Sequence, residues 1–237
     1  MTKDKSSLNI TYSINYPSRL LKSSIFKRKD RPGITLAIAS YRYGHLAAHC
    51  IESILSQTVT PARVIFVDDG AGDCAHLPRI YPSIDFILRE KNLGIPENFQ
   101  DILDRIDTEY AMFLGADNWL RSDAIELLSG KTTDIVTYDI MVTGSLRDEI
   151  VRRHPAEITR LQGDFYWSRK GGHHGSMMYR TSLAKRFGYA KRIEASPYPE
   201  EDWNLWNRMR ADGATVTHIE QALLYYRRHH ENFLKYA

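Results

Sequence analysis

The alternation of apolar runs and helical patterns between residues 34 and 117 is the feature that most narrows the fold of this chain. Two stretches repeat apolar residues at helical spacing, HLAAHCIESILSQ (45–57) and IPENFQDILDRI (95–106). Short apolar runs around them predict buried strands: ITLAIAS (34–40), RVIFVDDG (63–70), SIDFILRE (83–90) and EYAMFLGAD (109–117). Because strands and helices alternate through short connections, we predict an α/β fold with a mostly parallel central sheet flanked by helices.

The alternation weakens beyond about residue 130. The charged, irregular stretch 144–172 predicts a loop region, which we expect to lie over the ligand-binding site. The remaining patterns predict strands at 134–142 and 175–180, a helix at 200–213, and two short strands at 214–220 and 222–229.

Composition limits the class of protein. A chain of 237 residues with 43% hydrophobic and 26% charged residues suffices for one large domain. The sequence has neither a signal peptide nor an apolar run near the ~20 residues that a membrane-spanning helix needs. The net charge of +3 is too small to indicate a nucleic-acid partner, and the two cysteines, Cys50 and Cys74, fit a reducing compartment. We therefore expect a cytoplasmic protein without a nucleic-acid partner.

A basic leader, residues 1–32, precedes the predicted domain at 33–237. We predict that it is solvated and partly disordered, or appended to the domain; contact with an anionic membrane surface, such as the inner membrane, is the alternative. One basic cluster in it stands out just before the first strand: Lys22, Lys27, Arg28, Lys29 and Arg31.

Polar residues gather where the predicted strands end. They lie in SYRYG (40–44), DDGAGD (68–73) and ADNW (116–119). In open parallel sheets, ligands bind outside the carboxyl ends of the strands. The sequence carries neither GxGxxG nor GxxxxGK[ST], so the phosphate-binding loops of dinucleotide folds and P-loop proteins are not indicated.

Several of these segments, taken in order, resemble family 2 glycosyltransferases with the GT-A fold. The matching segments are ASYR (39–42), SILSQT (53–58), VDDGAGD (67–73), KNLGIPENF (91–99), FLGADNW (113–119), EEDWNLWNRM (200–209) and LYYRRHH (224–230). The resemblance covers roughly residues 34–230. It implies a nucleotide-sugar-binding half at 33–128 and an acceptor-binding half at 129–237.

The chain departs from the family pattern at three positions. Arg42 replaces the usual Asn, Ala71 replaces the Ser after Asp-Asp-Gly, and Gly115 stands where the first acid of Asp-x-Asp is usual. Asp117, the second acid of that motif, is retained. The resemblance makes Asp117 the ligand of a Mn or Mg ion, with His229 as a further metal contact. The structural alternative is that Asp117 caps the helix starting near Ser122.

The resemblance also implies how a nucleoside-diphosphate sugar is held. Uridine is the expected nucleoside, and dTDP- and GDP-sugars are the alternatives. Asp69 would accept the N–H of the base, Asp68 would support the loop, Tyr41 would stack on the base, and Ser40 would meet ribose or phosphate. An Asp- and Gly-rich turn, without ligand, is the alternative reading of the acid pair. Further donor contacts are expected from Arg89, Asn92, Asn98 and Ala116; a surface arginine is an equal reading of Arg89.

On the acceptor side, Asp202 is the expected general base and Glu201 its helper. The expected acceptor is a hydroxyl of a glycan or of a lipid-linked acceptor, which attacks the anomeric carbon of the donor sugar with inversion. Acids in a first helical turn also favour the helix dipole, and both roles can coexist. Trp203 and Trp206 are predicted to be core residues or, alternatively, a sugar platform. A nucleotidyltransferase and a non-catalytic nucleotide-sugar-binding relative remain the other functional hypotheses.

Overall fold

The computed structural model describes residues 33–189 and 201–232, so the predicted leader (1–32) lies outside the described residues. Within this part of the chain, ten strands form one sheet, whose main path has the order β3-β2-β1-β4-β9-β6-β10-β5. Each helix of the described residues is too short or too polar to span a lipid bilayer.

The N-terminal part of the sheet is parallel, as predicted. It contains β1 (Ile34–Ser40), β2 (Arg63–Asp68), β3 (Asp85–Leu88) and β4 (Tyr110–Gly115). The intervening helices are α1 (Gly44–Leu55), α2 (Leu77–Ile80) and α3 (Ile95–Asp104). Both long helices predicted here are therefore confirmed.

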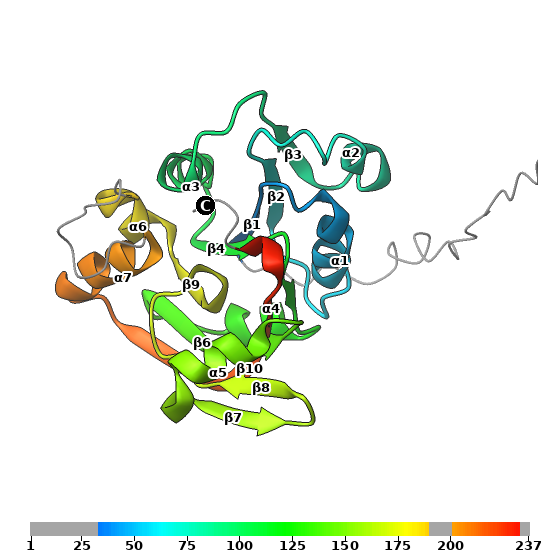
Figure 1. Cartoon of the computed structure of the whole chain (residues 1–237). Helices are drawn as coiled ribbons and strands as arrows, with labels where there is room; N and C mark the ends of the chain where they lie inside the picture. The colour runs from blue at the N-terminus through cyan, green and yellow to red at the C-terminus, as the bar shows by residue number, and fades with distance from the viewer. Residues whose placement is uncertain (1–32, 190–200, 233–237) are drawn as a thin grey trace, which may run out of the picture. The chain divides into compact units, whose positions relative to one another are not determined.

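Strand β1 shows why both faces of this sheet are apolar. Ile34, Leu36 and Ile38 belong to the hydrophobic cluster that contains α1, whereas Ala37 belongs to the cluster that contains α3. Successive side chains of a strand point to opposite faces, so a continuous apolar run is needed to fill both clusters. Figure 1 shows α1 on one side of the sheet and α3, α6 (Thr181–Phe187) and α7 (Glu201–Ala211) on the other.

The C-terminal part makes the sheet mixed. Strand β9 (Met177–Arg180) pairs antiparallel with both β4 and β6 (Ile135–Thr143). Strand β10 (Val216–Arg227) runs parallel to β6 and antiparallel to the short β5 (Trp119–Leu120). Helix α4 (Ala124–Ser129) connects β5 to β6. As a result, the carboxyl end of β4 lies beside segments that follow it by about a hundred residues in the chain.

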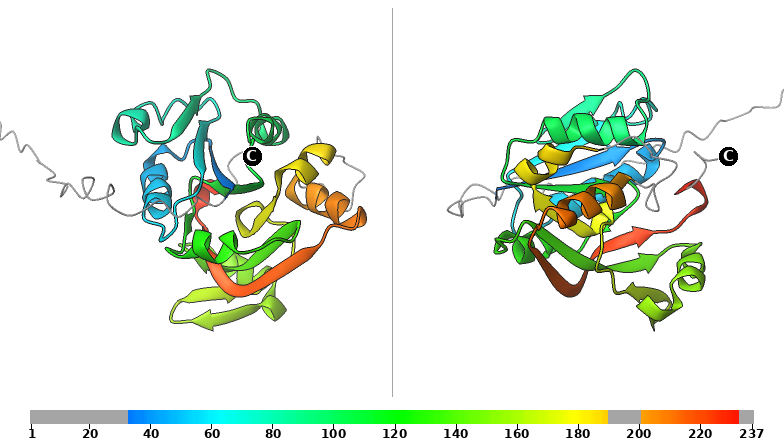
Figure 2. Two further views of the ribbon diagram at one scale, coloured as in Figure 1. Left: turned by 180° about the vertical axis from the view of Figure 1, so that it is seen from behind. Right: turned by 90° about the vertical axis from the view of Figure 1, so that its left-hand side faces the viewer.

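The prediction of an irregular loop at 144–172 was wrong. This stretch contains α5 (Arg147–Arg153), a 3₁₀ turn (Pro155–Glu157) and a hairpin of β7 (Ile158–Leu161) and β8 (Asp164–Trp167). Strand β8 pairs with β6, and the hairpin lies far from β3 in the views of Figures 1 and 2. The hydrophobic pattern of 144–172 is weak because only a few of its side chains, such as Ile150, Phe165 and Trp167, are buried, and charged residues surround them in the sequence.

The two short strands predicted at 214–220 and 222–229 are one continuous strand. Strand β10 keeps its pairing with β6 through register shifts between Ile219 and Ala222 and between Ala222 and Leu224. Such irregularities disturb the alternation of inward and outward residues, which is why the sequence reads as two segments.

Candidate active site

A pocket of about 550 Å³ lies at the carboxyl ends of β1 and β4, within the size range of small-ligand sites. Residues from distant parts of the chain line it, including His173 and His174 before β9, the first turn of α7, and Asn232 near the end of the described residues. The predicted site residues that line it are Ser40, Tyr41, Asp69, Asn92, Asn98, Asp117, Glu201 and Asp202. Asp68, Arg89, Ala116 and His229 are not among its described lining residues, and none of those comes from 144–172.

The two acids at the end of β2, Asp68 and Asp69, each organise a loop. Asp68 is buried, and its two carboxylate oxygens accept the N–H groups of Ala71 (3.0 Å) and Gly72 (2.9 Å). The oxygens of Asp69 accept the N–H groups of Leu93 (3.1 Å) and Gly94 (3.2 Å). Asp68 thus closes its own turn, while Asp69 ties a second loop to the wall of the pocket.

Burial raises the pKa of Asp69, and the two backbone N–H groups together with the Arg89 guanidinium oppose that shift. Arg89 Nε lies 3.3 Å from Asp69 Oδ1. Its Nη2 donates to Asp101 Oδ2 (2.6 Å) and to Asn98 Oδ1 (3.2 Å). Arg89 therefore contacts two lining residues from behind, instead of reaching into the pocket as predicted.

The loop after β1 contains one departure from the family pattern, Arg42. Arg42 has a φ of 65°, in the left-handed region that Asn tolerates better than most residues. The Arg42 guanidinium lies 5.1 Å from the centre of the Tyr41 ring. The Tyr41 ring, predicted to stack on the base, therefore already has a cation near it.

Asp117 follows the end of β4 and lies at the centre of a hydrogen-bond network. Its Oδ1 accepts the Asn118 amide (2.9 Å), and its Oδ2 accepts the Asn232 amide (2.7 Å). His229 Nε2 lies 3.3 Å from the same Oδ2. Asn118 Oδ1 in turn accepts the Arg227 N–H (2.9 Å), so the segment after β10 is fastened to the end of β4.

A carboxylate and an imidazole nitrogen that meet beside an open pocket fit a divalent cation of the Mn or Mg type. Asp117 supplies the oxygen that such ions prefer, and His229 Nε2 supplies a nitrogen ligand 3.3 Å away from it. The predicted metal pair is therefore brought together. Ala116, by contrast, is fully buried in the core, so its side chain cannot touch a ligand.

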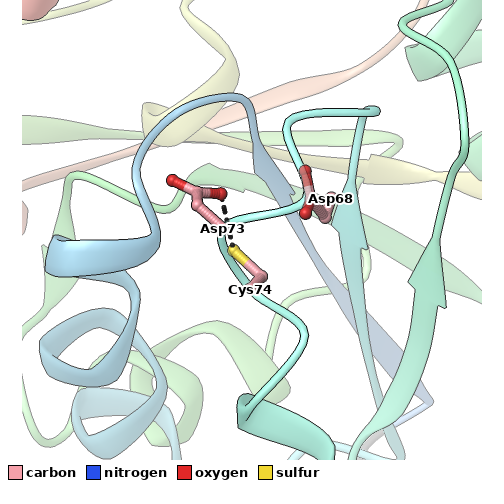
Figure 3. A group of neighbouring side chains, drawn as sticks. All are labelled: Asp68, Asp73 and Cys74. Atoms are coloured by element: carbon pink, nitrogen blue, oxygen red, sulfur yellow. Dashed lines mark hydrogen bonds between the residues drawn. The ribbon is translucent and has the colours of Figure 1, made fainter.

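A second group of potential ligands lies nearby but is organised differently (Figure 3). Ligand atoms of Asp68, Asp73 and Cys74 lie within 4.8 Å of one another. Asp68 is engaged with its own turn, and Asp73 Oδ2 accepts the Gly44 N–H (2.8 Å). Burial raises the pKa of the Cys74 thiol to about 12, so it stays protonated and donates to Asp73 Oδ1 (3.4 Å). This group joins the β2 turn to the start of α1.

The missing first acid has a steric counterpart. A Cβ atom at Gly115 would lie 2.6 Å from Asp117 Oδ1 and 3.0 Å from Asn118 Nδ2. The Asp117 carboxylate thus lies directly over Gly115, where a larger residue would displace it.

If Asp117 holds the metal at the donor, as predicted, Gly115→Ala should weaken metal-dependent donor binding by about tenfold, because the added methyl shifts the Asp117 carboxylate. The measurement is a donor titration with and without Mn²⁺, followed by thermal unfolding. Gly130→Ala is a matched control, since a Cβ there meets no atom within 4 Å. Equal donor affinity in both variants would contradict this account of Gly115.

Asp202 and Glu201 start α7 and face the pocket. Asp202 Oδ2 accepts the backbone N–H of His174 (3.2 Å), and its Oδ1 accepts the backbone N–H of Trp203 (2.7 Å). The carboxylate is thus held at two points.

The two tryptophans of α7 are packing residues. Trp206 is buried in a hydrophobic cluster, and Trp203 packs against it. Two glycines pack directly against these tryptophans. A Cβ atom added at Gly171 would lie 2.3 Å from the Trp203 ring, and one added at Gly172 would lie 2.3 Å from Trp206 Cβ. The core interpretation of these residues fits this arrangement better than a sugar platform.

Tyr43, Tyr226 and Asn232 line the pocket but were not named as site residues from the sequence, although Tyr43 lies in the strand-end stretch SYRYG (40–44). Tyr226 lies in LYYRRHH (224–230), the last segment of the family resemblance. Asn232 follows that segment, and no local pattern marks it. Asn118, which also lines the pocket, could have been found from its place beside Asp117.

Comparison with known proteins supplies relatives for this arrangement. The family model described as Glycosyl transferase family 2 matches residues 35–188. A putative glycosyltransferase, EpsH of Bacillus subtilis (strain 168), is 22% identical over 219 residues, which are 84% of this chain and 62% of EpsH. The chondroitin synthase of Escherichia coli is 30% identical over 113 residues, 45% of this chain and 16% of that protein.

Solved structures share the fold. Residues 1–349 of S. aureus TarS in complex with UDP-GlcNAc superimpose with a TM-score of 0.65 at 15% identity, covering 86% of this chain and 61% of that one. The mannosyltransferase PcManGT from Pyrobaculum calidifontis, in complex with GDP-Man and Mn²⁺, gives 0.57 at 14% identity, covering 87% and 60%. The chain thus spans about 60% of the length of EpsH and of these two solved chains.

Proposed function

The chain belongs to glycosyl transferase family 2 and has a GT-A type fold, and from this premise we propose that it is an inverting glycosyltransferase. It would move a sugar from a nucleoside-diphosphate sugar to a hydroxyl of a glycan or of a lipid-linked acceptor. The observation that carries the proposal is one pocket lined by three acids from separate elements, Asp69, Asp117 and Asp202.

The donor is proposed to lie between Asp69 and Asp117. Asp69 Oδ2 accepts one hydrogen bond, from Gly94, so a lone pair remains for the N–H of a uracil ring. Ser40, Tyr41, Asn92 and Asn98 surround the same end of the pocket. TarS has been solved with UDP-GlcNAc and PcManGT with GDP-Man. The Asp69 lone pair suits the ring N–H of uracil, thymine or guanine, and the choice of a UDP-sugar follows the family resemblance.

A divalent ion, Mn²⁺ or Mg²⁺, would be held by Asp117 and His229, and would neutralise charge on the departing diphosphate. Asn118 and Asn232 orient the Asp117 carboxylate from either side. The Asn232 amide donates to Asp117 Oδ2, the oxygen that also faces His229. When a cation binds Oδ2, this hydrogen bond would lengthen or break.

On the acceptor side, Asp202 would take the proton of the attacking hydroxyl. The hydroxyl oxygen forms a bond to the anomeric carbon as the bond from that carbon to the diphosphate oxygen breaks. The diphosphate leaves with the electron pair, and attack from the opposite face inverts the configuration. Glu201, the next acid on α7, would orient the acceptor.

Location and membrane contact stay predictions. The cytoplasmic assignment rests on composition, and any contact of the basic leader with a membrane surface concerns residues outside the described ranges. The division into a donor half and an acceptor half is likewise our proposal, supported by the origin of the lining residues.

A non-catalytic nucleotide-sugar-binding protein is the second candidate, favoured by Gly115 in place of an acid. One experiment separates the two functions. The purified full chain is screened against UDP-, dTDP- and GDP-sugars with and without Mn²⁺, first by thermal unfolding and then by release of nucleoside diphosphate. An enzyme should be stabilised by a donor and release its diphosphate, by hydrolysis or by transfer. Stabilisation without release over prolonged incubation supports the binding protein, and no stabilisation by any donor overturns both proposals.

A further inference from the structure

A chain of buried polar groups leads from the sheet to the proposed base. Tyr179 on β9 and Tyr189 join their hydroxyls at 2.7 Å, and the Tyr189 hydroxyl lies 2.9 Å from His174 Nε2. The His174 backbone N–H donates to Asp202 Oδ2, and its ring Nδ1 lies 3.9 Å from the same oxygen. The His174 ring therefore lies between the tyrosines and the acids of α7.

Only one direction of hydrogen bonding suits the row of Tyr179, Tyr189 and His174. If Tyr179 donates to Tyr189 and Tyr189 donates to His174 Nε2, the ring proton is on Nδ1 and faces Asp202 and Glu201, at 3.9 and 4.0 Å. In the reverse direction, a lone pair on Nδ1 would face two carboxylates. The first direction is favoured because an N–H beside carboxylates is attractive, whereas a lone pair there is repulsive.

We infer that His174 is a positioning residue for sugar transfer: Tyr179 and Tyr189 hold its ring as the Nδ1–H tautomer, and its backbone and ring N–H groups orient the Asp202 carboxylate. This inference rests on the proposed function for its kinetic consequence. The tautomer and the hydrogen-bond chain can be tested without turnover.

The neutral state of His174 matters for the basicity of Asp202. A neutral N–H orients a carboxylate, whereas an imidazolium beside it would form an ion pair and make it a weaker base. Burial lowers the pKa of His174 to about 4, although Glu201 opposes the shift. The group thus stays uncharged throughout the range near neutral pH.

The surroundings of the ring explain this. On α3 and β4 it meets the aromatic rings of Phe99, at 4.2 Å between centres, and Phe113, at 5.7 Å. The titratable groups that face it are Glu201 and Asp202 on α7, Tyr179 and Tyr189 with pKa values raised by burial, and the neighbouring His173, whose pKa burial lowers to about 3.

The first test is spectroscopic. Two-dimensional ¹⁵N NMR of histidine-labelled full chain, with the His174 signals assigned through His174→Gln, reports the tautomer of the ring. We expect the Nδ1–H tautomer and no protonation down to about pH 5. An Nε2–H tautomer, or a titration near the ordinary histidine pKa of about 6.5, overturns the inference whatever the enzyme does.

The second test is Tyr189→Phe, which removes the hydroxyl and keeps the ring. Without a donor to Nε2, the neutral form of His174 is less favoured, so its pKa should rise. We expect turnover to fall about tenfold or more, and the acid limb of the pH–rate profile to move to higher pH, with donor affinity unchanged. Tyr179→Phe should act in the same direction with a smaller effect.

Tyr110→Phe is the matched control. Tyr110 is also buried, and its hydroxyl donates to the Thr133 carbonyl (3.1 Å), away from the pocket lining. It should lower thermal stability to a similar extent without moving the acid limb. If Tyr189→Phe changes stability and the acid limb no more than Tyr110→Phe does, the hydrogen-bonded tyrosines are only structural and the inference is wrong. If the unchanged protein transfers no sugar, the proposed function fails, and the NMR result still decides the tautomer of His174.

Discussion

Asp202→Asn should lower the rate of sugar transfer by roughly 10²–10⁴-fold while donor binding persists. The amide keeps the size of the side chain and can still accept one of the two N–H groups, from His174 or Trp203, that hold Asp202. It lacks the basic lone pair that takes the proton of the acceptor. Steady-state transfer rates measure the loss, and donor affinity is measured separately by thermal unfolding.

Glu201→Gln is the matched control, because it neutralises the adjacent acid in the same helical turn. We expect a smaller loss of turnover if Glu201 only orients the acceptor. Near-normal turnover of Asp202→Asn, together with a large loss in Glu201→Gln, would transfer the role of base to Glu201.

Asp117→Asn should abolish the metal-dependent part of donor binding. The change removes the charge that a divalent cation requires and leaves the size of the side chain unaltered. A donor at 100 times its dissociation constant stabilises a protein by about 2.7 kcal/mol, so loss of binding is visible as a loss of that stabilisation. The measurement is thermal unfolding with UDP-sugar across a range of Mn²⁺ concentrations.

Asp73→Asn tests the other acidic group. It neutralises one member of the Asp68, Asp73 and Cys74 group while its amide oxygen can still accept the Gly44 N–H. We expect its metal dependence to match that of the unchanged protein. If Asp73→Asn loses the metal effect and Asp117→Asn retains it, the cation belongs to the β2 turn instead of to Asp117.

Local patterns in the sequence were sufficient for much of the donor side. Strands 34–40, 63–70 and 109–117 are apolar on both faces because helices cover both faces of the sheet, and that requirement is written in consecutive residues. Strand ends in a parallel sheet share one edge, so Ser40, Asp69 and Asp117 could be expected to meet before any coordinates were known.

Side chains that only partly follow such a pattern were harder to place. Arg89 directly follows β3 and could have reached the ligand, but Asp101 on α3 binds it at 2.6 Å, and Arg89 is not among the lining residues of the pocket. The hairpin of β7 and β8 was missed because it buries few residues on β6, leaving mostly charged side chains in the sequence.

The sequence by itself determined the alternation of strands and long helices up to about residue 117, the family resemblance and the identity of the acids, because periodicity and turn chemistry act between residues a few positions apart. Only the tertiary structure decided which distant groups orient those acids. Asn232 bonds Asp117 across 115 positions, and the His174 backbone bonds Asp202 across 28. These partners depend on how β10 returns beside β5 and how α7 packs against the sheet, and no local spacing encodes a hydrogen bond between segments that meet only after the core has formed.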